Sequence, residues 1–350
     1  MDREFYLKLA QQRLAMPIGA DLVLSEKEDP EAIRRDGPRL GAVITEAARR
    51  FRSPLAFPLM DLQIEKEFLL TLLGVPGTER EQFHFDVEED HGALLERVRE
   101  RLPGQPATPG MSGALGALKC VAAEPDLVPI GMSIGPFSFL TKLIEDPITQ
   151  VYMAEVGDED DEEVVGIHEI LQLATEVVAH WIGLQIEAGA RAICVCEPAA
   201  NTIYLSPKQL EADPEIFDRM VIQYNRRLVD LMEAHGVDLI FHDCGELIPV
   251  MIGKFQQLNP AILSLGSPVP LWEAVPYTSR DTVLFGNLPS KKFFSDKEYP
   301  ESKLEAEAAE LRRKMDATGH PYILGSECDV LTVKGCECAI HRKTELLLRC

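Results

Sequence analysis

Residues 237–245 read VDLIFHDCG, a short apolar run that ends directly in His242, Asp243 and Cys244. Such a run, followed at once by a glycine, is typical of a buried strand in a parallel sheet. Residues i and i+2 of a strand point to the same side, so the side chains of His242 and Cys244 project together from the end of this strand. An imidazole beside a thiolate suits zinc. The segment therefore predicts a buried parallel strand whose carboxyl end carries a metal-binding pair.

Further apolar runs of the same kind alternate with amphipathic segments along the chain. The runs occupy residues 55–60, 128–134, 190–196, 261–265, 282–285 and 322–325. The amphipathic segments, typical of helices with one covered face, include 169–188, 213–234 and 301–317. This alternation indicates repeated βα units, and seven visible strands suggest an eighth. We expect an α/β fold: a single (β/α)8 TIM-type barrel over residues 54–350, preceded by an N-terminal helical extension over residues 1–53.

A second strand-like segment, residues 322–329 (YILGSECD), places Cys328 at its carboxyl end. All strands of a (β/α)8 barrel end at one rim, so Cys328 can join His242 and Cys244 there. Three protein ligands are typical of a catalytic zinc site, which keeps one position open. On the residues alone, a hydrogen-bonded histidine and two packed thiols remain an equally good interpretation.

Composition restricts the classes of partner. The net charge is −22, from 57 acidic and 35 basic residues, which disfavours binding to a phosphate backbone. The N-terminus is charged and amphipathic, and nowhere do apolar residues run long enough to span a membrane. We therefore expect a cytoplasmic protein with no nucleic-acid or membrane partner. Eight cysteines in such a protein indicate metal binding, reactivity or packing rather than disulfides.

Several motifs together resemble one protein family. They are PLMDLQIEKE (58–67), SIGPFSFL (133–140), EPAA (197–200), LSP (205–207), GNL (286–288) and HDCG followed later by GSECD. This set resembles the corrinoid-linked zinc methyltransferases of the uroporphyrinogen decarboxylase superfamily, the methylcobamide:coenzyme M type. The resemblance implies that His242, Cys244 and Cys328 bind zinc. It also implies a methyl group moving between a corrinoid such as methylcobalamin and a small thiol or methylated molecule. The chain has no DxHxxG signature, so we expect the corrinoid on a separate carrier protein.

Other residues of these motifs are candidates for the barrel mouth. Glu197 ends a strand and is a candidate proton acceptor or further zinc ligand, and Asp61 is a candidate for orienting substrate. Ser133, Gly135 and Asn287 are candidates for substrate binding.

Two segments outside these motifs are also informative. Cys336, Cys338 and His341 could form a second metal cluster, but a CxC on a short loop more often indicates exposed thiols. GNLPSKKFF (286–294) departs from the GNxDP that relatives usually carry.

Two other functions stay open. The first is a decarboxylase of the same superfamily, which needs basic side chains converging on the barrel mouth; the RQAGRY segment of the decarboxylase proper is absent here. The second is a barrel without catalytic activity that binds a corrinoid protein. The sequence fixes neither the direction of methyl transfer nor the identity of donor and acceptor.

Overall fold

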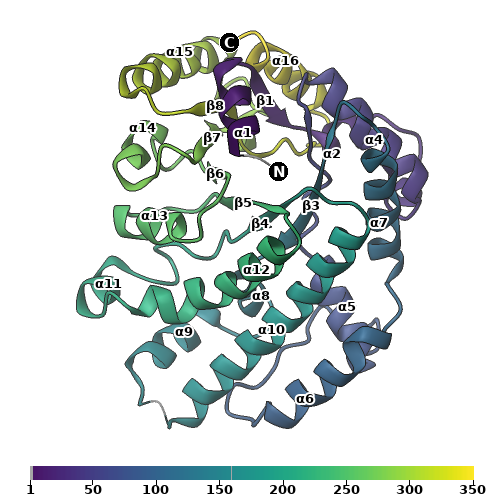
Figure 1. Ribbon diagram of the computed structural model, residues 1–350, viewed down its shortest axis with the longest axis vertical. Helices are drawn as coiled ribbons and strands as arrows, with labels where there is room; N and C mark the ends of the chain where they lie inside the picture. Colours follow the sequence, from purple (N-terminus) through teal and green to yellow (C-terminus); the bar gives the residue numbers. More distant parts are fainter. Residues whose placement is uncertain (1–2, 159) are drawn as a thin grey trace.

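The computed structural model describes residues 3–158 and 160–350, which form a curled sheet of eight parallel strands surrounded by helices (Figure 1). The strand order is β1-β8-β7-β6-β5-β4-β3-β2, which is the cyclic order of a barrel with β1 and β2 at the two edges. The strands are β1 Ala15–Ile18, β2 Leu55–Ala56, β3 Val128–Ile134, β4 Ala192–Cys196, β5 Asp238–Asp243, β6 Ile262–Leu265, β7 Val283–Leu288 and β8 Tyr322–Asp329. The expected (β/α)8 TIM-type fold is confirmed.

Seven of these strands lie on the apolar runs of the sequence, and β1 is the eighth. β1 belongs to residues 1–53, so the segment expected to be a helical extension also gives the sheet a strand, which pairs with β8. Met1 and Asp2 lie outside the described residues. The division of the chain at residue 53 stays a prediction.

Helices cover the outer face of the sheet (Figure 1). The longest, α10, spans 26 residues and buries one face against the barrel wall. The helices are α1 Arg3–Gln11, α2 Ala20–Ser25, α3 Pro30–Arg34, α4 Gly37–Arg50, α5 Ile64–Leu73, α6 Gly92–Arg101, α7 Pro109–Ala122, α8 Pro136–Leu140, α9 Pro147–Val156, α10 Glu162–Glu187, α11 Pro207–Ala212, α12 Gln223–Ala234, α13 Pro249–Gln256, α14 Leu271–Ala274, α15 Glu301–Thr318 and α16 Glu337–Leu347. Short 3-10 turns include η4, Ser290–Lys292.

Alternation along the strands separates two apolar cores. In β4, Ile193 and Val195 pack with the helices, whereas Cys194 and Cys196 belong to the core enclosed by the strands. Both cysteines are buried, which confirms that they pack as small apolar side chains.

Helix α1 packs at the amino ends of the strands. Tyr6 and Leu9 belong to the inner core. The hydroxyl of Tyr6 donates to Asp238, the first residue of β5, and the Arg3 guanidinium donates to the carbonyl of Pro260, just before β6. The carboxyl ends of the strands are therefore the end left for a functional site, as in other barrels.

The barrel wall opens between β2 and β3. β2 pairs with β3 only through Leu55 and Ala56, so the edge of β3 beyond that point lacks a neighbouring strand. Side chains replace it. The amide of Gln185 accepts from the backbone N–H of Met132 (2.8 Å) and donates to its carbonyl (3.1 Å), to which Trp181 Nε1 also donates (3.0 Å). Buried backbone groups need such partners, and α10 thus provides them at this gap.

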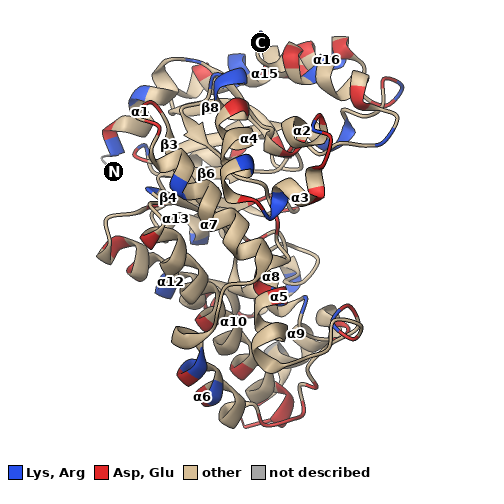
Figure 2. Cartoon of the chain, turned by 90° about the vertical axis from the view of Figure 1, so that its right-hand side faces the viewer, with Lys and Arg blue, Asp and Glu red and all other residues tan. Residues whose placement is uncertain are grey.

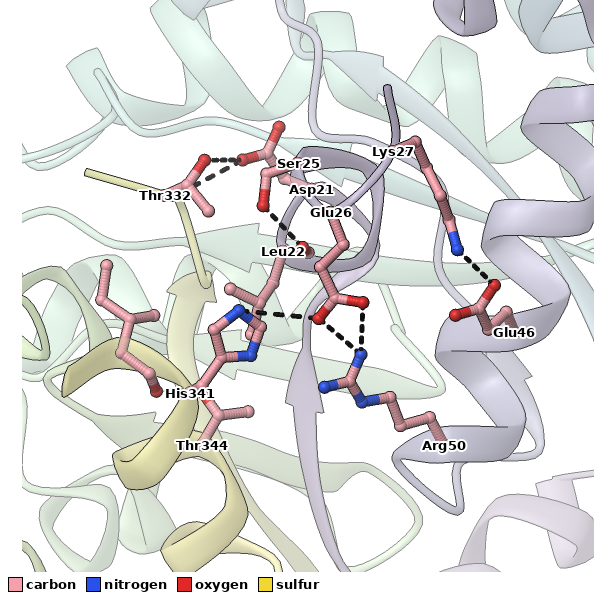
Figure 3. Close-up of polar contacts among 11 residues, drawn as sticks. Asp21, Leu22, Ser25, Glu26, Lys27, Glu46, Arg50, Thr332, His341 and Thr344 are labelled. Carbon is pink, nitrogen blue, oxygen red and sulfur yellow. Dashed lines mark hydrogen bonds and ion pairs between the residues drawn. The ribbon is translucent and has the colours of Figure 1, made fainter. Parts of the chain in front are cut away.

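The chain after β8 is tied to the N-terminal helices (Figure 3). Asp21 accepts from the backbone N–H and the hydroxyl of Thr332. The carboxylate of Glu26 forms an ion pair with Arg50 (2.6 Å) and lies 3.5 Å from Nε2 of His341. His341 therefore contacts Glu26, directly after α2, and does not form a metal-binding group with Cys336 and Cys338 among the described residues.

Acidic and basic side chains are distributed over the outer helices and loops (Figure 2). Among the described residues, no helix is both long enough and apolar enough to cross a membrane.

Candidate metal centre

His242, Cys244 and Cys328 come together at the carboxyl rim of the barrel. His242 lies near the end of β5, Cys244 follows that strand, and Cys328 lies near the end of β8. One potential ligand atom from each lies within 4.8 Å of those of the other two. Within residues 3–158 and 160–350, this is the one group of three or more His, Cys, Asp or Glu side chains placed to share a metal ion.

The imidazole of His242 is oriented by the neighbouring strand. His242 and Ser264 are partners in the register of β5 and β6, and Nδ1 lies 2.9 Å from the Ser264 hydroxyl. The other ring nitrogen, Nε2, is buried and has no hydrogen-bond partner among the described residues. A buried polar atom without a partner is unfavourable, and a metal ion at Nε2 would satisfy it.

The two thiols stabilise each other's charge state. A hydrogen bond with Cys328, together with the nearby His242 and Lys291, lowers the pKa of Cys244, while the same hydrogen bond and burial raise the pKa of Cys328. Sγ of Cys328 also lies 3.5 Å from Sδ of Met60. Both thiols are half-buried, so they can be reached from the rim. Of the two thiols, Cys244 is therefore the more acidic.

Lys291, in η4, is a cation beside both thiols. Desolvation acts to lower the pKa of its ammonium group, but attraction to Cys244 and Cys328 outweighs this and raises it. Lys291 belongs to the GNLPSKKFF segment that departs from the family pattern. The departure therefore places a positive charge at the candidate metal centre.

The loops around the three candidate ligands are held by the carboxylate of Glu327 and by a close approach of two backbone segments. The carboxylate of Glu327 accepts from the N–H groups of Ser267 (3.1 Å) and Lys291 (3.3 Å), which joins the loops after β6 and β7. A Cβ on Gly266 would lie 2.6 Å from Cα of Cys244, so the close approach of these two loops requires glycine.

Glu197, expected at the barrel mouth, is fully buried and binds the start of α8. Its carboxylate accepts from the backbone N–H of Phe137 (3.1 Å) and Ser138 (2.8 Å) and from the amide of Asn225 (2.7 Å). A Cβ on Gly135 would overlap the carboxyl group of Glu197. Gly135 therefore leaves space for this carboxylate.

The remaining candidates also have defined contacts. The Ser133 hydroxyl donates to Glu65 (2.7 Å), and burial raises the pKa of that carboxyl to about 7. Asp61 accepts from the N–H of Gln63 (3.1 Å) and lines a cavity at the gap between β2 and β3. The amide of Asn287 donates to the carbonyls of Gly266 (2.7 Å) and Val269 (2.6 Å), and so holds the loop that packs on Cys244.

The donor set fits zinc: two thiols and one imidazole, whose buried Nε2 has no hydrogen-bond partner among the described residues. The sequence predicted that His242, Cys244 and Cys328 come together, which the structure confirms. Ser264, Lys291 and Met60, which lie beside them, were not predicted. Pairing of β5 with β6 was the available signal for Ser264. Met60 and Lys291 carry no signal of their own, since both reach the cluster through loop conformation.

Comparisons with known proteins agree with this fold. The sequence profile described as uroporphyrinogen decarboxylase (URO-D) matches residues 91–337. Among solved structures, a methyltransferase from Methanosarcina mazei is similar, with a TM-score of 0.64 and 16% sequence identity over 95% of this chain and 94% of that chain. At this identity the likeness shows the fold alone. No curated protein matches the sequence. The profile spans most of the chain, including His242 and Cys244, and the chain belongs to the uroporphyrinogen decarboxylase family.

Proposed function

We propose that the chain is a zinc-dependent methyltransferase that moves a methyl group between a corrinoid and a small thiol or another methyl acceptor or donor. The observation that carries the proposal is the convergence of His242, Cys244 and Cys328, with Nε2 of His242 free of other partners. The family match and the similarity to a structure named as a methyltransferase support it.

Each residue of the cluster has a role in this proposal. His242, Cys244 and Cys328 would hold the zinc, which when bound supplies a Lewis acid that keeps an incoming thiol as the nucleophilic thiolate. Ser264 keeps the ring of His242 in place, so that Nε2 would be available to hold the zinc. The combined negative charge of two protein thiolates and one substrate thiolate is larger by one than the positive charge of the zinc ion. Lys291 lies beside this excess negative charge and would stabilise it.

Access to the cluster is from the carboxyl rim, because α1 packs at the opposite end. A corrinoid is too large to lie inside the barrel, and we therefore propose that it arrives on a carrier protein that docks at this rim. We place the reaction in the cytoplasm, where thiols stay reduced.

A metal-free decarboxylase is the alternative within the same family. It would use basic groups to bind substrate carboxylates, and Lys291 is a basic group at the rim. The two thiols and the free imidazole nitrogen favour the metal-dependent reaction, since a decarboxylase has no use for thiolates beside a histidine.

Metal analysis and a demethylation assay test the proposal. Purified protein should hold about one zinc ion per chain, as expected for a single catalytic site. Zinc-loaded protein should demethylate methylcobalamin in the presence of at least one member of a thiol panel. His242→Ala should lose both properties, and Cys338→Ala, at an exposed cysteine outside the cluster, should keep both. Full zinc content and full activity in His242→Ala would overturn the proposal.

A further inference from the structure

A cavity of about 310 Å³ lies in the gap between β2 and β3 and extends to the covering helices α4 and α7. Its walls include apolar side chains from the sheet and from both helices: Leu40, Ile44, Ala56, Leu118, Ile130 and Met132. Helices α3, α4 and α7 lie together on this flank (Figure 2). We call this space the lateral cavity. Its volume is at the lower end of the range for small-molecule sites and twice that of an apolar cavity that holds benzene.

The deep part of the lateral cavity has few polar groups to offer. Gln185 and Trp181 line it, but their polar atoms are engaged with the backbone of Met132. A ligand portion bound there gains apolar contacts and needs no hydrogen bonds. The deep part therefore suits the apolar body of a molecule.

The lining of the lateral cavity includes more acidic than basic side chains. Arg34 forms ion pairs with Asp21 (2.9 Å) and Glu31 (3.7 Å), and these carboxylates compensate its positive charge. Asp61, Glu67 and Arg35 remain on the lining, two carboxylates against one guanidinium. The chain as a whole carries a charge of −22, which adds to the attraction for a cation.

The lateral cavity is separate from the candidate metal centre. Pro58, Leu59 and Asp61 line it, whereas Met60, between them in sequence, contacts Cys328. The segment 58–61 is thus a partition with the cavity on one side and the thiols on the other. None of the three candidate metal ligands is among the described residues that line the cavity.

We propose that the lateral cavity binds a small molecule with an apolar body and one ammonium group, with the body between α4, α7 and β3 and the ammonium group at Asp61 and Glu67. This binding site is distinct from the candidate metal centre, where the metal-dependent reaction is proposed to take place.

Three probes of matched shape test the charge preference by calorimetric titration of the zinc-loaded protein: phenethylamine, phenethyl alcohol and hydrocinnamate. The amine should bind more tightly than the alcohol by about fivefold, the size of one partly exposed charge interaction, and the carboxylate should bind most weakly. Asp61→Asn combined with Glu67→Gln should remove the advantage of the amine over the alcohol. Glu305→Gln, a charge change on the exposed face of α15, should leave it unchanged.

Filling the lateral cavity tests its location. Leu118→Trp should weaken binding of phenethylamine at least about tenfold, because the larger ring takes the space of the apolar body. Ala114→Leu, on the half-buried part of the cavity wall, makes the same test with a smaller change should Leu118→Trp fail to fold. Cys244→Ala should bind the amine as the wild-type protein does, which separates this site from the metal centre. Equal or tighter binding of hydrocinnamate, unchanged binding after cavity filling, or loss of binding in Cys244→Ala would each overturn the proposal.

Discussion

Nδ1 of His242 and Oγ of Ser264 lie 2.9 Å apart on adjacent strands, directly opposite each other in the register of β5 and β6. This contact orients the imidazole, and a ring nitrogen of His242 lies within 4.8 Å of the thiols of Cys244 and Cys328. A residue that orients a metal-binding histidine typically raises the affinity for the metal, because it holds the imidazole in the position needed for binding.

Replacing the orienting hydroxyl should weaken zinc binding. Ser264→Ala is expected to lower zinc affinity about 10- to 100-fold, the usual effect of losing such a partner, with the fold intact. Competition with a chelating dye gives the affinity. The matched control is Ser25→Ala, whose hydroxyl caps a backbone carbonyl in α2, away from the cluster. Unchanged zinc affinity in Ser264→Ala would mean that the ring of His242 is held by its packing alone.

Removing the cation beside the thiols should change their reactivity. The hydrogen bond with Cys328 contributes most to the lowered pKa of Cys244, and attraction to Lys291 adds to it. Without the positive charge of Lys291, the thiolate form of Cys244 is less stable relative to the thiol. Lys291→Gln should therefore raise the pKa of Cys244. In metal-free protein at a fixed pH below the pKa of a free thiol, alkylation of Cys244, followed by mass spectrometry, should then be slower. The neighbouring Lys292→Gln serves as control. Equal rates in the wild type and Lys291→Gln would contradict the role given to Lys291.

The sequence predicted the barrel because most strands are apolar runs of ordinary length. β3 was predicted with its observed limits, residues 128–134. β1 was missed because its four residues, Ala15–Ile18, follow α1 after a short turn and are too few to show a period. β2 was predicted to reach residue 60 but ends at Ala56, because the chain beyond Ala56 turns away from β3. Side chains from α10 and α5 accept the hydrogen bonds of the β3 backbone that a longer β2 would have accepted.

The convergence of His242, Cys244 and Cys328 was predictable for a geometric reason, because strand ends meet at one rim. On the residues alone, their use as metal ligands stayed open, and only the family resemblance predicted it. The surroundings were not predictable in the same way. Glu197 is at a strand end as expected, but the start of α8 provides its hydrogen-bond donors, and this depends on how the chain turns after Gly135. Whether Glu197 and Asp61 act in catalysis, and whether Ser133, Gly135 and Asn287 bind substrate, stay predictions.

Glu65 should make stability depend on pH. Burial raises the pKa of this carboxyl from 4.5 to about 7, so the folded chain keeps a proton that the unfolded chain loses. The free energy of unfolding should therefore be highest below the unfolded pKa and fall as the pH rises towards the folded pKa, by up to about 3 kcal/mol in total. Urea unfolding across this range measures the slope. Glu65→Gln should lack this component, whereas Glu67→Gln, exposed on the same helix, should retain it. The same slope in Glu65→Gln as in the wild type would contradict this prediction.

The pairing of Gly135 with Glu197 should appear as a coupling in stability. A side chain at position 135 would overlap the carboxyl group of Glu197, and both residues are held by the turn into α8. Gly135→Ala should therefore lower the free energy of unfolding by about 1 to 3 kcal/mol, the usual cost of overpacking a buried site. Glu197→Ala should also destabilise, because the N–H groups of Phe137 and Ser138 lose their acceptor.

The double variant distinguishes overlap from two independent losses. Glu197→Ala removes the atoms that the new methyl group would meet, so Gly135→Ala combined with Glu197→Ala should be more stable than the sum of the two single changes predicts, by at least about 0.5 kcal/mol. Denaturant unfolding of all four proteins gives the coupling. The same set of proteins addresses the metal centre, because zinc content should stay near that of the wild type if Glu197 supports α8 and is not a zinc ligand. Additive stabilities would contradict the overlap between a side chain at position 135 and Glu197, and loss of zinc in Glu197→Ala would return this carboxylate to the metal site.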